Sequence, residues 1–258
     1  MKNYKLLFFS FLFIVQINLL AQGSAGESAK FEYRNLIDMP AAGILEKGYV
    51  GVTNNILPEG VVISKLEVGV FENVSFGISY GGANIIGSGK PDWYNLPGVN
   101  IRFRLLNESI NFPALTLGFD SQGKGLEYEN PDRYQIKSPG FFASASKNFQ
   151  FLGYLSLHAT ANYSFEKNDG DNFLNFKLGA EKTIGESFSL VSEYDFGFND
   201  NSATSLGRGN GYLNLGLKLS VASGITISLE IRDIFNNKRW SPNSADRAIT
   251  IEYIKSIF

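Results

Sequence analysis

Side chains alternate between apolar and polar at every second position over much of this chain, and this pattern constrains the fold more than any other feature. The clearest stretch is 154–165. One set of positions there holds Leu155, Leu157, Ala159, Ala161, Tyr163 and Phe165, and the other holds Ser156, His158, Thr160, Asn162 and Ser164. Because successive side chains of a β-strand point to opposite faces, the pattern predicts strands with one apolar and one polar face. No segment has a helical apolar stripe of useful length, so the chain is predicted to be all-β.

Twelve segments of this kind are predicted strands: 48–56, 61–71, 74–82, 98–106, 113–121, 140–148, 154–165, 173–181, 187–198, 211–221, 225–232 and 248–257. Their links alternate between short (72–73, 107–112, 149–153, 182–186, 222–224) and long or intermediate (83–97, 122–139, 166–172, 199–210, 233–247). Transmembrane barrels have short periplasmic turns, longer extracellular loops and an even number of antiparallel strands. A soluble sandwich gives no reason for this rhythm. The sequence therefore predicts a single antiparallel transmembrane β-barrel of about twelve strands over 48–258.

The two ends of the chain indicate export. Lys2 and Lys5 precede an apolar run that continues to Val15, and cleavage is expected after Ala21, so residues 1–21 are a predicted signal peptide. Residues 22–47 are expected to form an N-terminal periplasmic segment. The chain ends on Phe258, which resembles the terminal aromatic signal for barrel assembly. We therefore expect a location in the outer membrane of a Gram-negative-type bacterium, with outer-membrane lipid and the barrel-assembly machinery as partners.

Composition narrows the classes of function. The formal net charge is −2, and the predicted signal peptide carries two lysines and no acid. Nucleic-acid binding is not expected, because it needs a basic excess or patch. The chain contains no cysteine, which excludes disulfides and acylation on Cys. There is no glycine-rich phosphate loop before a helix and no metal-ligand cluster of recognised spacing, so no cofactor is predicted.

The polar face of the predicted strands carries charges of both signs. In a membrane barrel this face lines the lumen, whereas the apolar face meets lipid. A balanced set of charges suits either a lumen filled by ion pairs or a small aqueous pore. The residues predicted to line the lumen are Arg102, Arg104, His158, Lys177, Glu193, Lys218, Glu230 and Arg232.

The segment from Asn35 to Gly82 carries a likeness to a known family. It reads Asn35-Leu36-Ile37-Asp38-Met39-Pro40-Ala41-Ala42-Gly43-Ile44-Leu45, later followed by Gly77-Ile78-Ser79-Tyr80-Gly81-Gly82. This resembles the opening of the YjbH-type family of outer-membrane barrels, in which a proline followed by small residues precedes the first strand. The resemblance implies an association with exopolysaccharide production and implies no catalytic residue.

Catalytic and metal chemistry have weak candidates. Ser156 and His158 lie two apart on the polar face of one predicted strand, and a serine hydrolase uses such a pair when imidazole activates the hydroxyl. No third group that would orient the base is identifiable. Asn168, Asp169, Asp171 and Asn172 offer oxygen ligands for Ca²⁺, but the spacing lacks the closing Glu of an EF-hand and Asn-Asp-Gly is ordinary turn sequence. Neither catalytic residues nor a metal site are predicted.

Two long loops hold aromatic residues beside charged ones. Trp93 and Tyr94 lie in the loop 83–97, and Trp240 lies in the loop 233–247. Aromatic faces beside charges suit sugar binding, and they equally suit the aromatic girdle at a membrane interface. These three residues are the candidate ligand contacts in the loops.

These observations favour a non-enzymatic outer-membrane barrel that takes part in the export or assembly of an exopolysaccharide. The first alternative is a narrow porin-like channel for small solutes, and the second is a barrel-embedded lipid hydrolase. The exopolysaccharide hypothesis and the porin-like alternative share the barrel and differ in what crosses its lumen.

Overall fold

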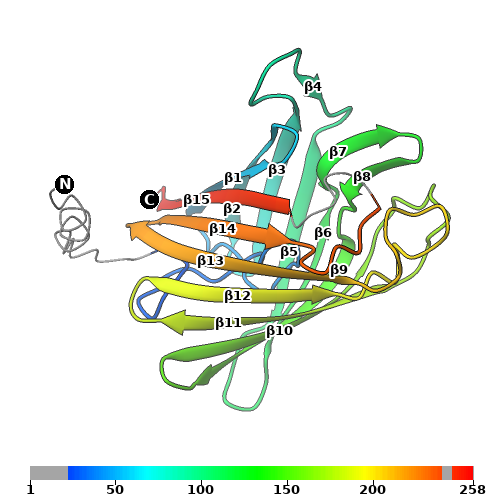
Figure 1. Cartoon of the computed structure of the whole chain (residues 1–258). Helices are drawn as coiled ribbons and strands as arrows, with labels where there is room; N and C mark the ends of the chain where they lie inside the picture. The colour runs from blue at the N-terminus through cyan, green and yellow to red at the C-terminus, as the bar shows by residue number, and fades with distance from the viewer. Residues whose placement is uncertain (1–22, 240–245, 258) are drawn as a thin grey trace, which may run out of the picture.

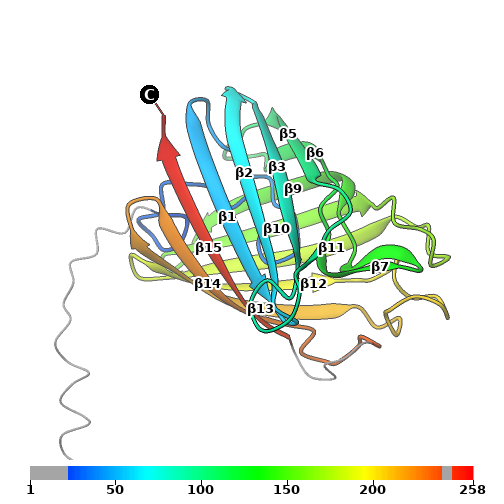
Figure 2. The ribbon, with the colours of Figure 1, turned by 90° about the horizontal axis from the view of Figure 1, so that it is seen from above.

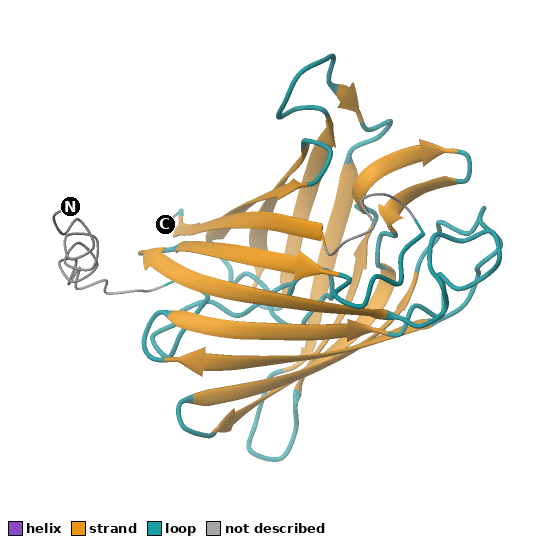
Figure 3. Cartoon of the chain, viewed as in Figure 1, coloured by secondary structure: helices purple, strands orange, loops and turns teal. Residues whose placement is uncertain are grey.

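The computed structural model describes residues 23–239 and 246–257, and within them it contains fifteen strands. They are β1 (Tyr49–Leu57), β2 (Val61–Phe71), β3 (Val74–Ala83), β4 (Asp92–Trp93), β5 (Gly98–Leu106), β6 (Ala114–Asp120), β7 (Lys124–Glu129), β8 (Asp132–Ile136), β9 (Gly140–Gln150), β10 (Tyr154–Tyr163), β11 (Asn175–Ile184), β12 (Phe188–Asp195), β13 (Tyr212–Ala222), β14 (Ile225–Arg232) and β15 (Asp246–Ser256). Figure 3 shows only strands and loops in the described part of the chain. No described helix has the length and apolar character needed to cross a membrane.

Twelve of these strands form one closed antiparallel barrel (Figure 1). Consecutive barrel strands pair with each other, and β1 pairs with β15 while β2 pairs with β3, so the ring has no open edge. The predicted fold class is confirmed, and all twelve predicted strands are present with shifts of a few residues at their ends. In Figure 2 the strands β1–β3 and β10–β12 on opposite walls cross at an angle, as expected for strands tilted in a barrel.

The remaining strands belong to the long loops. β4 adds a two-residue extension beside β3, and β7 pairs with β8 in a hairpin between β6 and β9. These three short strands were not predicted within the long loops, because each has too few residues to show a periodicity. The loops join strands at one end of the barrel, and tight turns such as 72–73 and 223–224 lie at the other end. We call these the loop end and the turn end.

The two faces of the strands differ as the alternation predicts. Large apolar side chains on the outer face are exposed, among them Leu66, Phe76, Ile78, Val99, Ile101, Phe103, Leu117, Leu157, Leu178, Leu190, Leu215, Leu229 and Ile249. Aromatic rings cluster on this face near the loop end, where Phe119, Phe141 and Phe165 contact one another at centroid distances of 5.1–6.1 Å. An apolar band with an aromatic girdle is the surface that a barrel presents to lipid.

Residues 23–47, here called the inner segment, enter the barrel, and residues 33–45 among them are buried or half-buried inside it. The expectation of a separate periplasmic segment over 22–47 does not describe their position, because their side chains and backbone contact the inner face of the strands. Leu36, Ile37, Met39, Ala41 and Ala42 are all at most 2 % exposed. The predicted signal peptide 1–21, Trp240 and Phe258 lie outside the described residues.

Candidate functional site: the lumen and its inner segment

The inner segment enters and leaves the lumen at the turn end. Near its start, the N–H of Glu27 donates to the carbonyl of Gly185, in the turn between β11 and β12. Near its finish, the N–H of Gly48 donates to the carbonyl of Gly69, at the end of β2. Between these points the backbone folds back on itself, with Leu36 N–H bonded to the Met39 carbonyl and Ala41 N–H bonded to the Arg34 carbonyl. The segment is therefore a hairpin-like loop whose tip, residues 36–39, lies within the barrel.

Glu193 of β12 binds the tip through the backbone. Its carboxylate accepts the N–H groups of Ile37 (2.9 Å), Asp38 (2.8 Å) and Met39 (3.0 Å). The amide of Asn214 on β13 donates to the same carboxylate at 2.8 Å. A buried carboxylate needs such donors, because burial removes the water that would otherwise solvate its charge.

Asp38 makes the reverse contact, from the tip to basic side chains. Its carboxylate lies 2.9 Å from Nε of Arg232 on β14 and 2.8 Å from Nζ of Lys124 on β7. The side chain of Arg232 is 1 % exposed and that of Asp38 is 6 % exposed. Arg232 also pairs with Glu230 at 2.7 Å. Removing one partner of a charge pair buried this deeply is strongly destabilising, because it leaves an uncompensated charge away from water.

Two arginines of β5 hold the returning arm of the inner segment. Arg102 donates to the carbonyls of Ala41 (3.0 Å) and Gly43 (3.4 Å), and Arg104 donates to the carbonyl of Ala42 (2.9 Å). Arg104 also pairs with Glu32. The guanidinium group suits this task because it offers five donors in a fixed planar arrangement.

Further wall residues complete the packing of the inner segment. The carbonyl of Pro40 accepts the hydroxyls of Ser144 (3.0 Å) and Thr160 (2.6 Å). Lys218 on β13 donates to the carbonyl of Asn35 at 3.2 Å, and its Nζ lies 4.0 Å from the centre of the Tyr33 ring. The inner segment therefore meets the wall mainly through hydrogen bonds and ion pairs.

A small apolar cluster lies beside these polar contacts. Tyr33, Leu36, Ile37, Met39 and Ala41 pack with Val191 of β12. Gly179 on the neighbouring strand β11 makes room for this cluster, since a Cβ atom there would lie 2.2 Å from Cδ1 of Leu36. The wall is therefore shaped to accept this segment at that point.

All eight predicted lumen residues are buried inside the barrel. Five of them, Arg102, Arg104, Glu193, Lys218 and Arg232, contact the inner segment directly. Lys177 pairs with Asp195 on the wall at 2.7 Å, and Glu230 pairs with Arg232. The sequence reasoning missed Glu32 and Asp38 as partners of these charges, and it missed Arg34, which pairs with Glu67 and Glu252 on the wall. Inward-facing glycines such as Gly179 were an available signal, because they leave space that some other segment must fill.

The Ser156–His158 pair considered for catalysis does not form. Nδ1 of His158 lies 2.8 Å from the hydroxyl of Ser146 on β9, and the hydroxyl of Ser156 donates to Asn148 instead. Nε2 of His158 is buried without a hydrogen-bond partner among the described residues. The Ser146 hydroxyl also accepts the N–H of Ala42 at 3.0 Å, so it serves to bind the inner segment.

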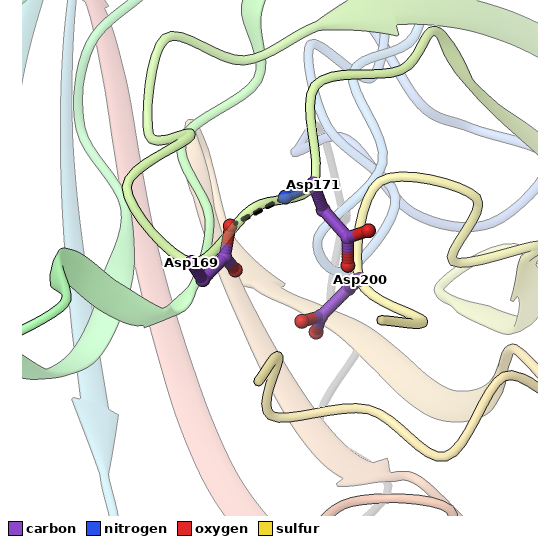
Figure 4. Close-up of side chains that lie close together, drawn as sticks. All are labelled: Asp169, Asp171 and Asp200. Carbon is purple, nitrogen blue, oxygen red and sulfur yellow. Dashed lines mark hydrogen bonds between the residues drawn. The ribbon is translucent and has the colours of Figure 1, made fainter. Parts of the chain in front are cut away.

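The acidic turn 168–172 contributes to a cluster of charges in the loops. Carboxylate oxygens of Asp169, Asp171 and Asp200 lie within 4.8 Å of one another (Figure 4). Arg133 of β8 lies between them, with Nη1 2.5 Å from Asp169 and 2.7 Å from Asp200. Nζ of Lys137 is 2.8 Å from Asp169. The positive charge that a cation would bring to this cluster is thus already supplied by the protein.

The candidate ligand contacts in the loops have different surroundings. Trp93 is 54 % exposed and stacks on Tyr80 of β3 at 5.8 Å, in the position of a membrane-interface aromatic residue. Tyr94 is buried, donates its hydroxyl to the carbonyl of Gly125 at 2.6 Å and packs edge-on against Tyr134. These two neighbours in sequence therefore do not share a binding surface.

Space inside the lumen is limited. A cavity of about 80 Å³ lies beside residues 34–38 of the inner segment, against the wall of β1, β2, β14 and β15 and the loop residues Lys124 and Lys137. It has room for a few water molecules and is well below the several hundred Å³ of a typical ligand pocket. At the turn end a wider cavity of about 320 Å³ is lined by residues that include Lys30, Arg104 and His158.

No protein-family model matches the chain, and no curated protein matches it. Among solved structures, the fold is similar to that of the KdgM porin, with 8 % identity, a TM-score of 0.52, and coverage of 80 % of this chain and 98 % of that one. The NanC porin matches with 8 % identity, a TM-score of 0.43 and the same coverages. The Acinetobacter baumannii outer membrane protein Omp33 matches with 6 % identity, a TM-score of 0.45, and coverage of 81 % and 98 %. At these identities the likeness concerns the fold, which is that of a porin-like outer-membrane β-barrel.

Proposed function

We propose that this protein is a non-enzymatic outer-membrane channel for small polar solutes, with a lumen that the inner segment narrows. The observation that carries the proposal is the inner face of the barrel, where charged and hydroxyl side chains follow one another from the turn end to the loop end. Such a lining is costly in a dry core and is natural along a water-filled path.

The number of strands supports the same proposal. Barrels of eight strands are just filled by their own side chains, whereas those of sixteen to eighteen leave an aqueous channel. This barrel of twelve strands lies between these sizes and holds an additional segment of its own chain. Its interior is therefore wider than the wall side chains alone would fill.

A role in the export or assembly of an exopolysaccharide receives less support. The first residues that carry the YjbH-type resemblance, Asn35 to Leu45, form the tip and the returning arm of the inner segment and occupy the lumen through which a polymer would pass. Similarity in fold to a porin favours a channel over polymer export. The family resemblance remains a prediction from the sequence.

The test is ion conductance and selectivity of the folded barrel in planar bilayers. The variant Lys177→Met removes a positive charge inside the lumen, and Lys255→Met removes one from an exposed position near the end of β15. In a salt gradient, we expect Lys177→Met to shift the reversal potential toward cation selectivity, because Asp195 loses its partner. We expect Lys255→Met to leave it unchanged.

Folding of each variant is checked by heat-modifiable gel mobility. Both variants are also measured in a chain lacking residues 23–46, in which the narrowing is removed. A correctly folded barrel that gives no conductance steps even without those residues would contradict the channel, as would equal selectivity for the two lysine variants.

A further inference from the structure

We propose that the inner segment is a plug that withdraws from the lumen toward the turn end when the channel opens. This inference rests on the proposed channel function. It assigns to residues 23–47 the role of a gate, with the closed state as the arrangement described above.

The path of the chain makes withdrawal possible. The inner segment enters and leaves the barrel at the same end, next to Gly185 and Gly69, and its tip at 36–39 is the deepest part. Nothing therefore has to be threaded through the barrel when the segment moves. Its second arm continues directly into β1, so the segment stays tethered to the barrel after it has left the lumen.

The contacts of the inner segment allow withdrawal without opening the barrel. In the described chain, its bridge between Asn35 and Pro40 is internal, and it adds no strand to the sheet. Within the lumen the wall holds it through side chains, chiefly Glu193, Arg102 and Arg104. Its backbone bonds to Gly185 and Glu186 involve the turn between β11 and β12 and no strand. Every strand-to-strand hydrogen bond of the barrel can therefore remain while the segment moves.

The wall that is exposed by withdrawal is suited to water. Several of its charges keep partners on the wall itself, as Arg232 does with Glu230 at 2.7 Å and Lys177 does with Asp195 at 2.7 Å. Arg104 keeps a hydrogen bond to Thr116 at 3.2 Å. The remaining charges would be hydrated in an open lumen, so the wall is left without buried unpaired charges.

The closed state is favoured by the contacts at the tip. Leu36, Ile37 and Met39 lose their burial when the segment leaves the lumen, and Asp38 loses Arg232 and Lys124. Lys124 belongs to β7, so this ion pair also joins the inner segment to the loop end of the barrel. Opening therefore requires that the tip contacts break first.

The experiment locks the inner segment to the wall with a reversible bond. The chain has no cysteine, so a pair can be introduced without competing thiols. The pair Ala42→Cys and Ser146→Cys joins the segment to β9, where the Ala42 nitrogen lies 3.0 Å from the Ser146 hydroxyl. The control pair Ser228→Cys and Thr250→Cys joins two directly opposed wall residues of β14 and β15.

Single-channel conductance in planar bilayers is recorded for the wild type, for both pairs in oxidised and reduced form, and for a chain lacking residues 23–46. We expect the deletion to stay at a high conductance level and the wild type to switch between a low level and that high level. The oxidised Ala42–Ser146 pair should remain at the low level, with switching at least 10-fold rarer, and dithiothreitol should restore it. The control pair should switch in both forms.

Three results have distinct meanings. Switching of the oxidised Ala42–Ser146 pair at the frequency of its reduced form would overturn the plug, provided that gel mobility and thiol labelling confirm the crosslink. A wild type that never leaves the low level, although the deletion conducts at a high level, would also overturn it and leave a fixed constriction. If a folded deletion variant is silent, the channel function fails, and the plug fails with it.

Discussion

The lumen is closed from two ends by two regions that are held in different ways. The inner segment is bound by side chains of the wall, one contact at a time along its backbone. At the loop end, residues 121–139, 164–174 and 196–211 form what we call the loop cluster, and its main ion pairs join one loop to another. Arg133 contacts Asp169 and Asp200 with no side-chain exposure of Arg133 or Asp169.

The two regions differ in which charged groups lose their partners when the region moves. Withdrawal of the inner segment exposes a polar wall to water, whereas opening of the loop cluster separates buried charges whose partners are the other loops. The loop cluster also rests on an apolar base, because its Tyr134 packs with Tyr94, Val61 and Ile63 outside the cluster. We therefore expect the loop cluster to be a fixed rim and the inner segment to be the part that moves.

The largest expected effect is that of Arg133→Met in the loop cluster. This change leaves Asp169 and Asp200 buried without their shared cation, which costs about 3–5 kcal/mol when one partner of a buried pair is removed. We expect residues 121–139 and 196–211 to become sensitive to limited proteolysis while the barrel keeps its heat-modifiable mobility. Arg208→Met, at an exposed position in the same loops, is the control and should change little. Equal protease resistance of the two variants would show that the ion pairs do not hold the loops.

A smaller effect is expected for Asp38→Asn in the inner segment. The substitution keeps the shape of the tip and removes the negative charge that Arg232 and Lys124 contact. Hydrogen bonds to charged groups contribute about 1.5–3 kcal/mol, which corresponds to roughly a 10- to 100-fold rise in the ratio of open to closed time. Single-channel recording measures that ratio. Glu46→Gln, at an exposed position of the same segment, is the control. Unchanged closed times in Asp38→Asn would mean that the tip does not hold the segment in place.

The sequence predicted the barrel well because strand faces are determined locally. Alternation alone orients Arg102 toward the lumen and Ile101 toward lipid, and the twelve strands follow from it. The position of Asp38 could not be predicted in this way. Residues 22–47 have no periodicity, and their place depends on partners such as Glu193 and Arg232, which lie far away in the sequence. The Ser156–His158 hypothesis failed for a related reason, because the strand register places Ser146 opposite His158.

The smallest expected effect is a pH dependence of the loop cluster. The carboxylate of Glu166 accepts the N–H groups of Tyr134 (2.8 Å) and Ser138 (2.7 Å), and burial raises its pKa above the usual value. A carboxyl group whose pKa is raised in the folded state favours docking below its ordinary pKa of about 4.3 and loses that contribution as the pH rises through the raised value. The docked loops should therefore become slightly less protected as the pH increases across this window.

Hydrogen exchange at the amides of Tyr134 and Ser138, corrected for intrinsic rates, measures this protection. Glu166→Gln should remove the pH dependence, because the side chain no longer titrates, and should weaken one of the two hydrogen bonds, because an amide offers a single oxygen. Glu129→Gln, at an exposed position of the β7–β8 hairpin, should retain the wild-type dependence. A pH dependence that persists in Glu166→Gln would contradict its assignment to this carboxyl group.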